Sequence, residues 1–284
     1  MEFTLLGTGS SGGVPRLGPD WGVCDPSEPK NRRMRCSALL EVGRDGGETT
    51  NVLIDTSPDF REQILRTGVT RLDSVLFTHD HADQCHGIDD LRLVAHCMRA
   101  RVPVRMMGET HDNLIRRFGY CFNGFEEGGY PAIIENGPEI VPCEAFRIDG
   151  PGGPVEVLPL DQDHGAVRSL GFRFGPLAYC NDVVTLPDES LRLLAGVGVF
   201  VVDALRYAPH PTHAHLAQAL EWADRIGAAR TVLTNLHIDM DYATLKRELP
   251  ETVEPAYDGM SVVIDGSGIH YRDRFAAHAA YSTD

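Results

Sequence analysis

The stretch that decides the fold is FTHDHADQCHGIDD, residues 77–90, which directly follows a short apolar run. It contains four side chains that can bind a metal within eight residues: His79, His81, Asp83 and His86. Two histidines separated by one residue on an extended turn can reach one ion, and imidazole suits zinc, iron and manganese. A lone histidine is usually a surface or satisfied core residue. This cluster directly after a buried strand instead predicts a metal site.

Composition and charge limit the classes of partner. The chain has 284 residues, of which 42% are hydrophobic and 24% are charged, as in an ordinary soluble globular protein. Its formal charge of −15 argues against binding long nucleic acid through a basic face. A bound metal can outweigh that charge locally, so a small phosphorylated substrate is compatible with it. The oligomeric state does not follow from the sequence, and a homodimer is left open.

The cysteines and the start of the chain bear on the cellular compartment. The seven cysteines are scattered and include no C-x-x-C pair, which argues against a disulfide framework and favours a reducing compartment. No apolar run approaches the length of a membrane span, and the start MEFTLLGTG has neither the basic segment nor the cleavage site of a signal peptide. We therefore expect a cytoplasmic protein that does not interact with membranes.

Apolar strand-like runs alternate with amphipathic helical segments along the chain, which predicts an α/β sandwich. No linker, repeat or low-complexity segment stands out, so we expect residues 1–284 to form a single domain. Several predicted strands end in a run that offers a metal ligand: SVLFTHDH, EVLPLDQDHG, LAYCND and TVLTNLHIDMD. Ligands bind open α/β sheets where strand ends converge, so we expect these side chains to meet.

The segment THDHAD, with HG three residues further on, resembles the H-x-H-x-D-H signature of the metallo-β-lactamase fold. The resemblance extends over most of the chain through LLGTGSSGGVP, LIDTSPDF, DQDHG, YCND and LTNLHIDMDY. A glycine-rich turn alone is weak evidence, but the ordered set is strong. The chain most resembles the PhnP-like phosphodiesterase branch, with ribonuclease Z as a more distant relative. This resemblance implies a four-layer αββα sandwich with a metal site at the strand ends on one edge.

The resemblance also implies the ligands of a first metal ion. That ion would be bound by His79, His81 and His164, and Asp182 would bridge it to a second ion. The implied cofactor is a divalent metal, present as one or two ions of Zn²⁺ or Mn²⁺.

The second ion would be held by Asp83 and His237, and we count Asp83 among the catalytic residues as well. At Gln84 the chain departs from the signature, which has a histidine ligand there. A glutamine oxygen is a weaker ligand than imidazole and shifts the preference from zinc toward manganese. His86 is displaced by two residues, so we expect it to support a ligand or face the substrate. Three outcomes are open: two ions with Gln84 as a weak ligand, two ions with water in its place, or one ion only.

A proton donor for the leaving group is expected near the segment RYAPHPTHAHLAQALE. A metal-bound hydroxide would attack at neutral pH, so the chain needs no nucleophile of its own. We expect a helix over residues 213–226 with Thr212 as its N-cap, and a helix N-terminus favours anions. The resemblance selects His213 as the general acid or phosphate clamp. His215 is a further candidate for substrate binding.

The segment PKNRRMRCS brings Arg32, Arg33 and Arg35 together in an acidic chain. We favour a solvated loop or arginines paired with local carboxylates, and the alternative is a rim that attracts an anionic substrate. Residues 7–13, GTGSSGG, could lend amides to a phosphate, but they lack the G-K-[ST] ending of a P-loop. A tight turn after the first strand is therefore favoured.

Three functions follow from these residues. We favour a metal-dependent phosphodiesterase acting on a small cyclic or nucleotide-like phosphodiester. A hydrolase acting at carbon, on a thioester, lactone or β-lactam, could use the same metals. A nucleotide-binding protein with impaired catalysis is the third function, and Gln84 is its best support. Processing of transfer RNA is disfavoured because no extended basic arm is visible. The irregular residues 120–153 are a candidate segment for shaping substrate access.

Overall fold

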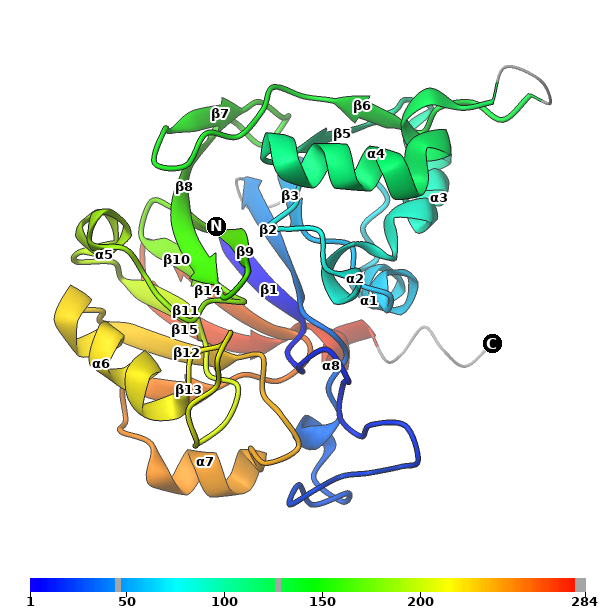
Figure 1. Cartoon of the computed structure of the whole chain (residues 1–284). Helices are drawn as coiled ribbons and strands as arrows, with labels where there is room; N and C mark the ends of the chain where they lie inside the picture. Colours follow the sequence, from blue (N-terminus) through cyan, green and yellow to red (C-terminus); the bar gives the residue numbers. More distant parts are fainter. Residues whose placement is uncertain (44–46, 126–128, 279–284) are drawn as a thin grey trace.

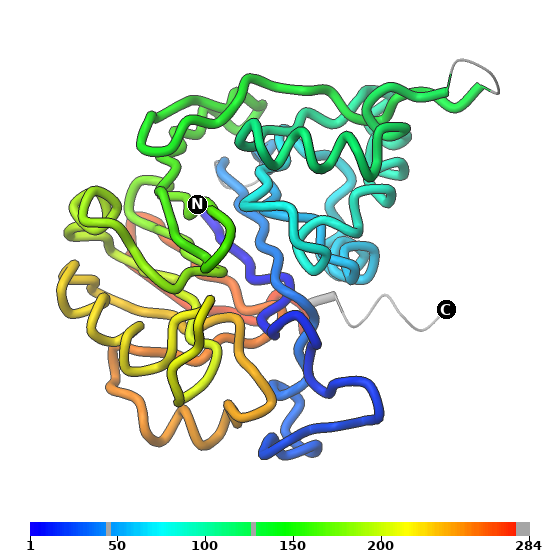
Figure 2. Tube along the Cα trace, in the orientation of Figure 1, coloured from blue at the N-terminus to red at the C-terminus, as the bar shows by residue number. Residues whose placement is uncertain are grey.

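Two β-sheets face each other in the middle of the molecule, and helices cover the outer face of each (Figure 1). The computed structural model describes residues 1–43, 47–125 and 129–278. The N-terminal half of the chain builds most of the first sheet, and the second sheet follows. The chain then returns to add two strands beside the first one (Figure 2). The αββα sandwich predicted as the fold class is confirmed.

The first sheet has eight strands. In spatial order they are β15 (Gly268–Asp273), β14 (Met260–Asp265), β1 (Glu2–Gly7), β2 (Ser37–Gly43), β3 (Thr49–Ile54), β4 (Ser74–Leu76), β5 (Val102–Arg105) and β6 (Ile134–Asn136). β1 pairs antiparallel with β14 and β2, whereas β3, β4, β5 and β6 run parallel. The carboxyl ends of β3 and β4 therefore meet at one edge.

The second sheet has seven strands. In spatial order they are β13 (Val253–Pro255), β12 (Arg230–Thr234), β11 (Val199–Asp203), β10 (Leu177–Cys180), β9 (Val167–Phe174), β8 (Val155–His164) and β7 (Phe146–Ile148). β10, β11, β12 and β13 are parallel, and β8 pairs antiparallel with β9. The loops after β10, β11 and β12 therefore lie at a common edge, where ligand sites of α/β sheets form.

Helices pack on the outer face of both sheets. On the first sheet lie α1 (Phe60–Thr67), α3 (Leu91–Met98), α4 (Gly108–Asn123) and α8 (Arg274–His278). On the second sheet lie α5 (Asp188–Leu194), α6 (Leu216–Ile226) and α7 (Tyr242–Glu248). Three short helices stand in loops: η1 (Pro29–Asn31), α2 (Ala82–Cys85) and η2 (Ile88–Asp90). No helix in the described part of the chain is long and apolar enough to cross a membrane.

The strands are apolar on both faces because each sheet is covered on both sides. In β2, Ala38 and Leu40 join the core between the sheets, whereas Leu39 joins the core under α1 and α3. In β11, Val201 faces the inner core and Phe200 packs against the outer helices. Successive strand residues point to opposite faces of the sheet, so a continuous apolar run packs into both the inner core and the core under the helices.

The helix expected over residues 213–226 starts later than predicted. α6 begins at Leu216, and its N-cap residue is His215. Thr212 lies in the loop before it, because the backbone there pairs with neighbouring segments. The Leu205 amide donates to the Ala214 carbonyl at 3.0 Å, and a further amide of the loop reaches the chain after β10. The prediction of Thr212 as N-cap is therefore wrong.

Residues 120–153 are more regular than expected. They contain the end of α4 and the strands β6 and β7, and residues 126–128 lie outside the described part. The rings of Tyr120, Phe125 and Tyr130 pack with centroids 5.7 to 5.9 Å apart. The role of this segment in substrate access stays a prediction.

Candidate metal centre

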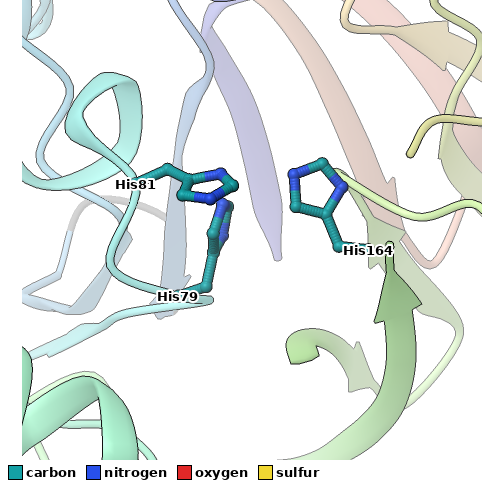
Figure 3. Close-up of side chains that lie close together, drawn as sticks. All are labelled: His79, His81 and His164. Carbon is teal, nitrogen blue, oxygen red and sulfur yellow. The ribbon is translucent and has the colours of Figure 1, made fainter. Parts of the chain in front are cut away.

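Three histidine rings meet where β4 and β8 end. His79 follows β4, His81 is the N-cap residue of α2, and His164 is the last residue of β8. Their ring centroids are 4.5, 5.0 and 5.1 Å apart, and one nitrogen of each lies within 4.8 Å of the others. Figure 3 shows the rings from two sides of the site turned toward one another. The structure thus gathers the three histidines expected around the first ion.

Hydrogen bonds on the outer side of two rings direct one nitrogen of each into the cluster. Nδ1 of His79 lies 3.0 Å from the Thr78 hydroxyl, which donates its own proton to Asp55 at 2.8 Å. Nδ1 of His164 donates to the Thr212 carbonyl at 2.7 Å. Nε2 of each ring is then unprotonated and available to a metal. The Nε2 atom of His79 is buried without a hydrogen-bond partner among the described residues, as fits a metal ligand.

Burial keeps both of these histidines neutral. It lowers the pKa of His79 well below its usual value, and burial together with the nearby His213 lowers the pKa of His164 to about 4. Imidazole must be neutral to bind a metal. The three imidazoles converge from the ends of two strands. Such a set of nitrogen ligands suits a divalent metal ion, so the three histidines could hold one.

Three polar residues at strand ends turn the chain sharply beside the histidines. Asp55 after β3, Asp182 after β10 and Asn235 after β12 have φ angles of 61°, 51° and 62°. Aspartate and asparagine tolerate this left-handed conformation better than other residues with a side chain. All three side chains are buried. The turns therefore lead the backbone out of each sheet while the polar groups stay inside.

The Asp182 carboxylate is held by amide groups on one side. Its Oδ2 accepts hydrogen bonds from Gln84 Nε2 at 2.8 Å and from Asn181 Nδ2 at 2.7 Å. Its Oδ1 lies 3.4 Å from Asn235 Nδ2 and 3.5 Å from His213 Nδ1. Burial raises the pKa of Asp182 well above its usual value, so a cation beside it would stabilise the carboxylate.

His213 stands on the loop after β11, beside the cluster. Its Nδ1 bonds the carboxylate of Asp203, the fully buried last residue of β11, at 2.8 Å. Its ring centroid is 4.7 Å from that of His164, and His213, His164 and Asp182 form a second group of ligand atoms within 4.8 Å. Burial alone would lower the pKa of His213, but the Asp203 carboxylate outweighs it and raises that pKa to about 9. Because Asp203 engages Nδ1, Nε2 is the atom that can exchange a proton.

The residues expected around a second ion are not gathered in the same way. Within the described residues, neither Asp83 nor His237 belongs to a group of three or more ligand atoms within 4.8 Å. Nε2 of His237 contacts the Arg16 guanidinium, and its Nδ1 lies 3.0 Å from the Asp239 carboxylate. Gln84 presents its amide nitrogen, not its oxygen, to the buried aspartate beside it. Metal binding by Asp83 and His237 stays a prediction.

Two further predicted residues lie apart from the cluster. His86 is exposed, and its ring packs edge-on against Phe118 with centroids 5.5 Å apart. Nδ1 of His215 lies 3.2 Å from the Gln218 side-chain oxygen on α6. The structure does not bring these histidines to the three-histidine cluster, and their contacts with substrate stay predictions.

The arginine segment before β2 mainly stabilises the loop. Arg35 pairs with Asp59 at 2.6 Å, as the favoured interpretation expects. Arg33 is 2% exposed and donates to a backbone carbonyl at 2.7 Å, so it is neither solvated nor part of a rim. Arg32 is exposed and lies over the Trp21 ring at 5.2 Å.

Two glycines of the predicted motifs allow close contacts between backbones. A Cβ atom on Gly7 would lie 2.0 Å from the Arg35 carbonyl oxygen, and one on Gly87 would lie 2.1 Å from the Ser57 carbonyl oxygen. Gly7 ends β1, and Gly87 follows the turn that carries His79 and His81. The first glycine-rich segment thus packs against the arginine segment, which supports its interpretation as a turn.

Four residues of the site were not among the predicted ones: Asp55, Asp203, Asn235 and Arg16. Asp55 and Asp203 could have been found from the sequence, because each ends an apolar strand, in VLIDT and FVVDA. A carboxylate placed there is expected to be buried, and a buried carboxylate needs polar partners. Asn235 ends a similar run, TVLTN. Arg16 lies in an exposed loop, and nothing in the local sequence indicates its contact with His237.

Comparison with known proteins agrees with this fold. Residues 50–238 match the Beta-lactamase superfamily domain, which covers more than half of the chain. The chain belongs to the beta-lactamase superfamily and has the metallo-β-lactamase fold. It is 36% identical to a diphosphatase of the PhnP family, with a TM-score of 0.80 over 92% of this chain and 95% of that one. The predicted relation to the PhnP-like branch is confirmed.

Two other relatives are more distant or longer. The Zn²⁺-bound PqqB of Methylobacterium extorquens has a TM-score of 0.66 at 18% identity, over 93% of this chain and 100% of that one, which shows the shared fold. An octanoyltransferase of Porphyromonas gingivalis is 33% identical over 287 residues, which is 99% of this chain and 55% of that protein. The chain thus spans about half the length of this relative. The family and the diphosphatase relative support a hydrolase that uses a divalent metal.

Proposed function

We propose that this protein is a metal-dependent phosphodiesterase that cleaves a small cyclic or nucleotide-like phosphodiester. The observation that carries the proposal is His213, bonded to the buried Asp203 at 2.8 Å and packed against His164 of the histidine cluster. A histidine oriented in this way beside a metal centre can protonate an alkoxide leaving group. The similarity to a diphosphatase of the PhnP family also favours chemistry at phosphorus over chemistry at carbon.

Each part of the site has a role in this reaction. When bound, the divalent ion supplies a Lewis acid that polarises the phosphoryl group and makes water nucleophilic at neutral pH. His79, His81 and His164 would hold that ion, and Asp182 offers a carboxylate oxygen beside them. His213 would donate the proton from Nε2 to the leaving oxygen, while Asp203 keeps the ring oriented through Nδ1.

An arginine-lined pocket includes Arg16, which contacts His237, and its charge suits an anionic substrate. The pocket has a volume of about 790 Å³ and lies against the loop of residues 11–17 and the arginine segment. Its two carboxylates, Asp59 and Glu62, are each paired with an arginine. Among the described residues, Arg16 and Arg32 of this pocket make no ion pair with a carboxylate. The pocket is therefore locally positive in a chain of formal charge −15.

We further propose zinc as the first metal to test. Three imidazole nitrogens form a ligand set that zinc commonly uses, and manganese prefers more oxygen ligands. The second candidate is hydrolysis of an acyl thioester. It is favoured by one observation, the match of nearly the whole chain to part of a P. gingivalis octanoyltransferase.

Hydrolysis assays separate these candidates. Chelator-treated protein, reloaded with Zn²⁺ or Mn²⁺, is assayed on a cyclic nucleotide, a diaryl phosphodiester, a nucleoside diphosphate and an octanoyl thioester. We expect turnover of a phosphodiester with at least one metal. Turnover of the thioester alone would replace the proposal with the second candidate. Tight nucleotide binding without turnover of any substrate would instead support a nucleotide-binding protein with impaired catalysis.

A further inference from the structure

The Asp182 carboxylate has little capacity left to bridge two ions. Its Oδ2 already accepts two amide hydrogen bonds, from Gln84 at 2.8 Å and Asn181 at 2.7 Å. A carboxylate oxygen has two lone pairs in the carboxylate plane, and these two donors take both. Oδ1 accepts one longer hydrogen bond, from Asn235 Nδ2 at 3.4 Å, and keeps a lone pair that could bind a metal. Asp182 can therefore bind the ion of the histidine cluster through Oδ1, but Oδ2 is occupied by hydrogen bonds within the protein.

Gln84 acts as a donor at the position where the signature has a histidine ligand. Its Nε2 donates to Oδ2 of Asp182 at 2.8 Å, and its Oε1 is buried without a hydrogen-bond partner among the described residues. Oε1 points away from Nε2 within the same planar group. To ligate an ion shared with Asp182, the amide would have to turn over and give up this buried hydrogen bond. Gln84 thus replaces a ligand with a hydrogen bond.

The histidine expected to bind the second ion is engaged by a cation instead. The Arg16 guanidinium contacts Nε2 of His237, and Nδ1 of the same ring lies 3.0 Å from Asp239. An arginine is protonated at any physiological pH, so it binds His237 through the lone pair that a metal would need. Its positive charge also repels a divalent ion from the same place.

The loop that carries Arg16 is anchored on both sides. The Gly9 amide donates to the Met34 carbonyl at 2.8 Å, and the Leu236 amide donates to the Thr8 carbonyl at 2.8 Å. Further along, the Val14 amide donates to a carbonyl of the arginine segment at 2.9 Å. The loop is thus paired with the segment that contains His237, which places the backbone of Arg16 beside that segment.

From these contacts we infer that the site binds one divalent ion, held by the three-histidine cluster, and that Arg16 stands at His237 where a second ion would bind. The inference rests on the proposed metal centre but not on the identity of the substrate. Arg16 also lines the pocket of about 790 Å³, so its charge faces the place proposed for an anionic substrate. A guanidinium there would take over the role of a second ion in binding a phosphoryl oxygen.

The number of bound ions tests the inference directly. Chelator-treated protein is titrated with Zn²⁺, and separately with Mn²⁺, and bound ions are counted by native mass spectrometry. We expect one ion per chain, with any second ion binding more than about 100-fold more weakly because His237 and one oxygen of Asp182 are engaged. His79→Ala should abolish binding of that ion, and His237→Ala should leave the count at one. Electron paramagnetic resonance of the wild-type protein loaded with Mn²⁺ should show isolated, uncoupled ions, which needs no variant.

A double variant should restore the second site. Gln84→His together with Arg16→Gln returns a ligand and removes the competing cation, so we expect a second bound ion. The matched control combines Gln84→His with Arg32→Gln, because Arg32 lines the same pocket but lies over Trp21 and not at His237. This control should stay at one ion. Thermal melting confirms that each variant is folded.

Two results would overturn the inference. One is a wild-type count of two ions of similar affinity that falls to one in His237→Ala. The other is a stripped wild-type protein that takes up no ion. Failure of the proposed function looks different, because a protein that cleaves no phosphodiester but binds one ion through His79 leaves the inference intact.

Discussion

Replacing His213 should slow the reaction in a way that depends on the leaving group. Its proton donor atom is oriented by the 2.8 Å bond to Asp203, which is 0% exposed. A positioned general acid contributes about 10²- to 10⁴-fold to the rate, which is about 2.7 to 5.4 kcal/mol of transition-state stabilisation. We expect His213→Ala to lose that factor in kcat/KM on a phosphodiester with an alkyl leaving group.

An activated leaving group separates proton donation from other roles. A 4-nitrophenolate leaves without needing a proton, so His213→Ala should lose less than about tenfold on that substrate. Asp203→Asn should show the same dependence on the leaving group with a smaller loss, since it acts by positioning the ring. The matched control is His210→Ala, which removes a neighbouring histidine whose ring centroid is 5.1 Å from that of His213. It should stay within about threefold of wild type, because one positioned group supplies the proton.

The assay is steady-state hydrolysis of both substrates at a saturating metal concentration, with metal content and thermal melting measured for each variant. An equal loss on both substrates would refute proton donation by His213 and leave it as a phosphate clamp. An unchanged rate on both would remove His213 from the reaction altogether.

Three further predictions concern metal affinity and stability. Asp55→Asn should weaken metal binding about 10- to 100-fold in a chelator competition, because it loosens the Thr78 hydroxyl that orients His79, a predicted metal ligand. Arg33→Met should lower the free energy of unfolding in urea by about 1 to 3 kcal/mol, because the buried Met240 carbonyl loses its donor at 2.7 Å. Burial raises the pKa of Asp241, but hydrogen bonds from Asn31 and from backbone amides outweigh it and lower that pKa to about 2. Because the folded-state pKa is depressed, this stabilisation is present at neutral pH and is lost as the pH falls through 2. Asp241→Asn should therefore flatten the acid limb of the stability profile measured by circular dichroism, and an unchanged limb would contradict this.

The layered fold could be predicted because its determinants are local. An apolar run feeds two layers when its successive residues point to opposite faces, as Leu39 and Leu40 do. Helices between such runs then cover the outer faces. The start of α6 could not be predicted in the same way, because the residues before it pair with segments that are distant in sequence. Tertiary pairing there overrode the local N-cap signal of Thr212.

The sequence alone was enough to predict the histidine cluster, because His79 and His81 are neighbours on one turn and the family resemblance adds His164. Only the tertiary structure decided what surrounds it. Arg16 and His237 meet across 221 residues of chain, and Gln84 reaches Asp182 across 98. Such contacts depend on how the two sheets and their loops come together, so they cannot be predicted from the local sequence pattern. Residue types and spacing therefore predict a metal site here, whereas the long-range contacts are the basis for our inference about how many ions it binds.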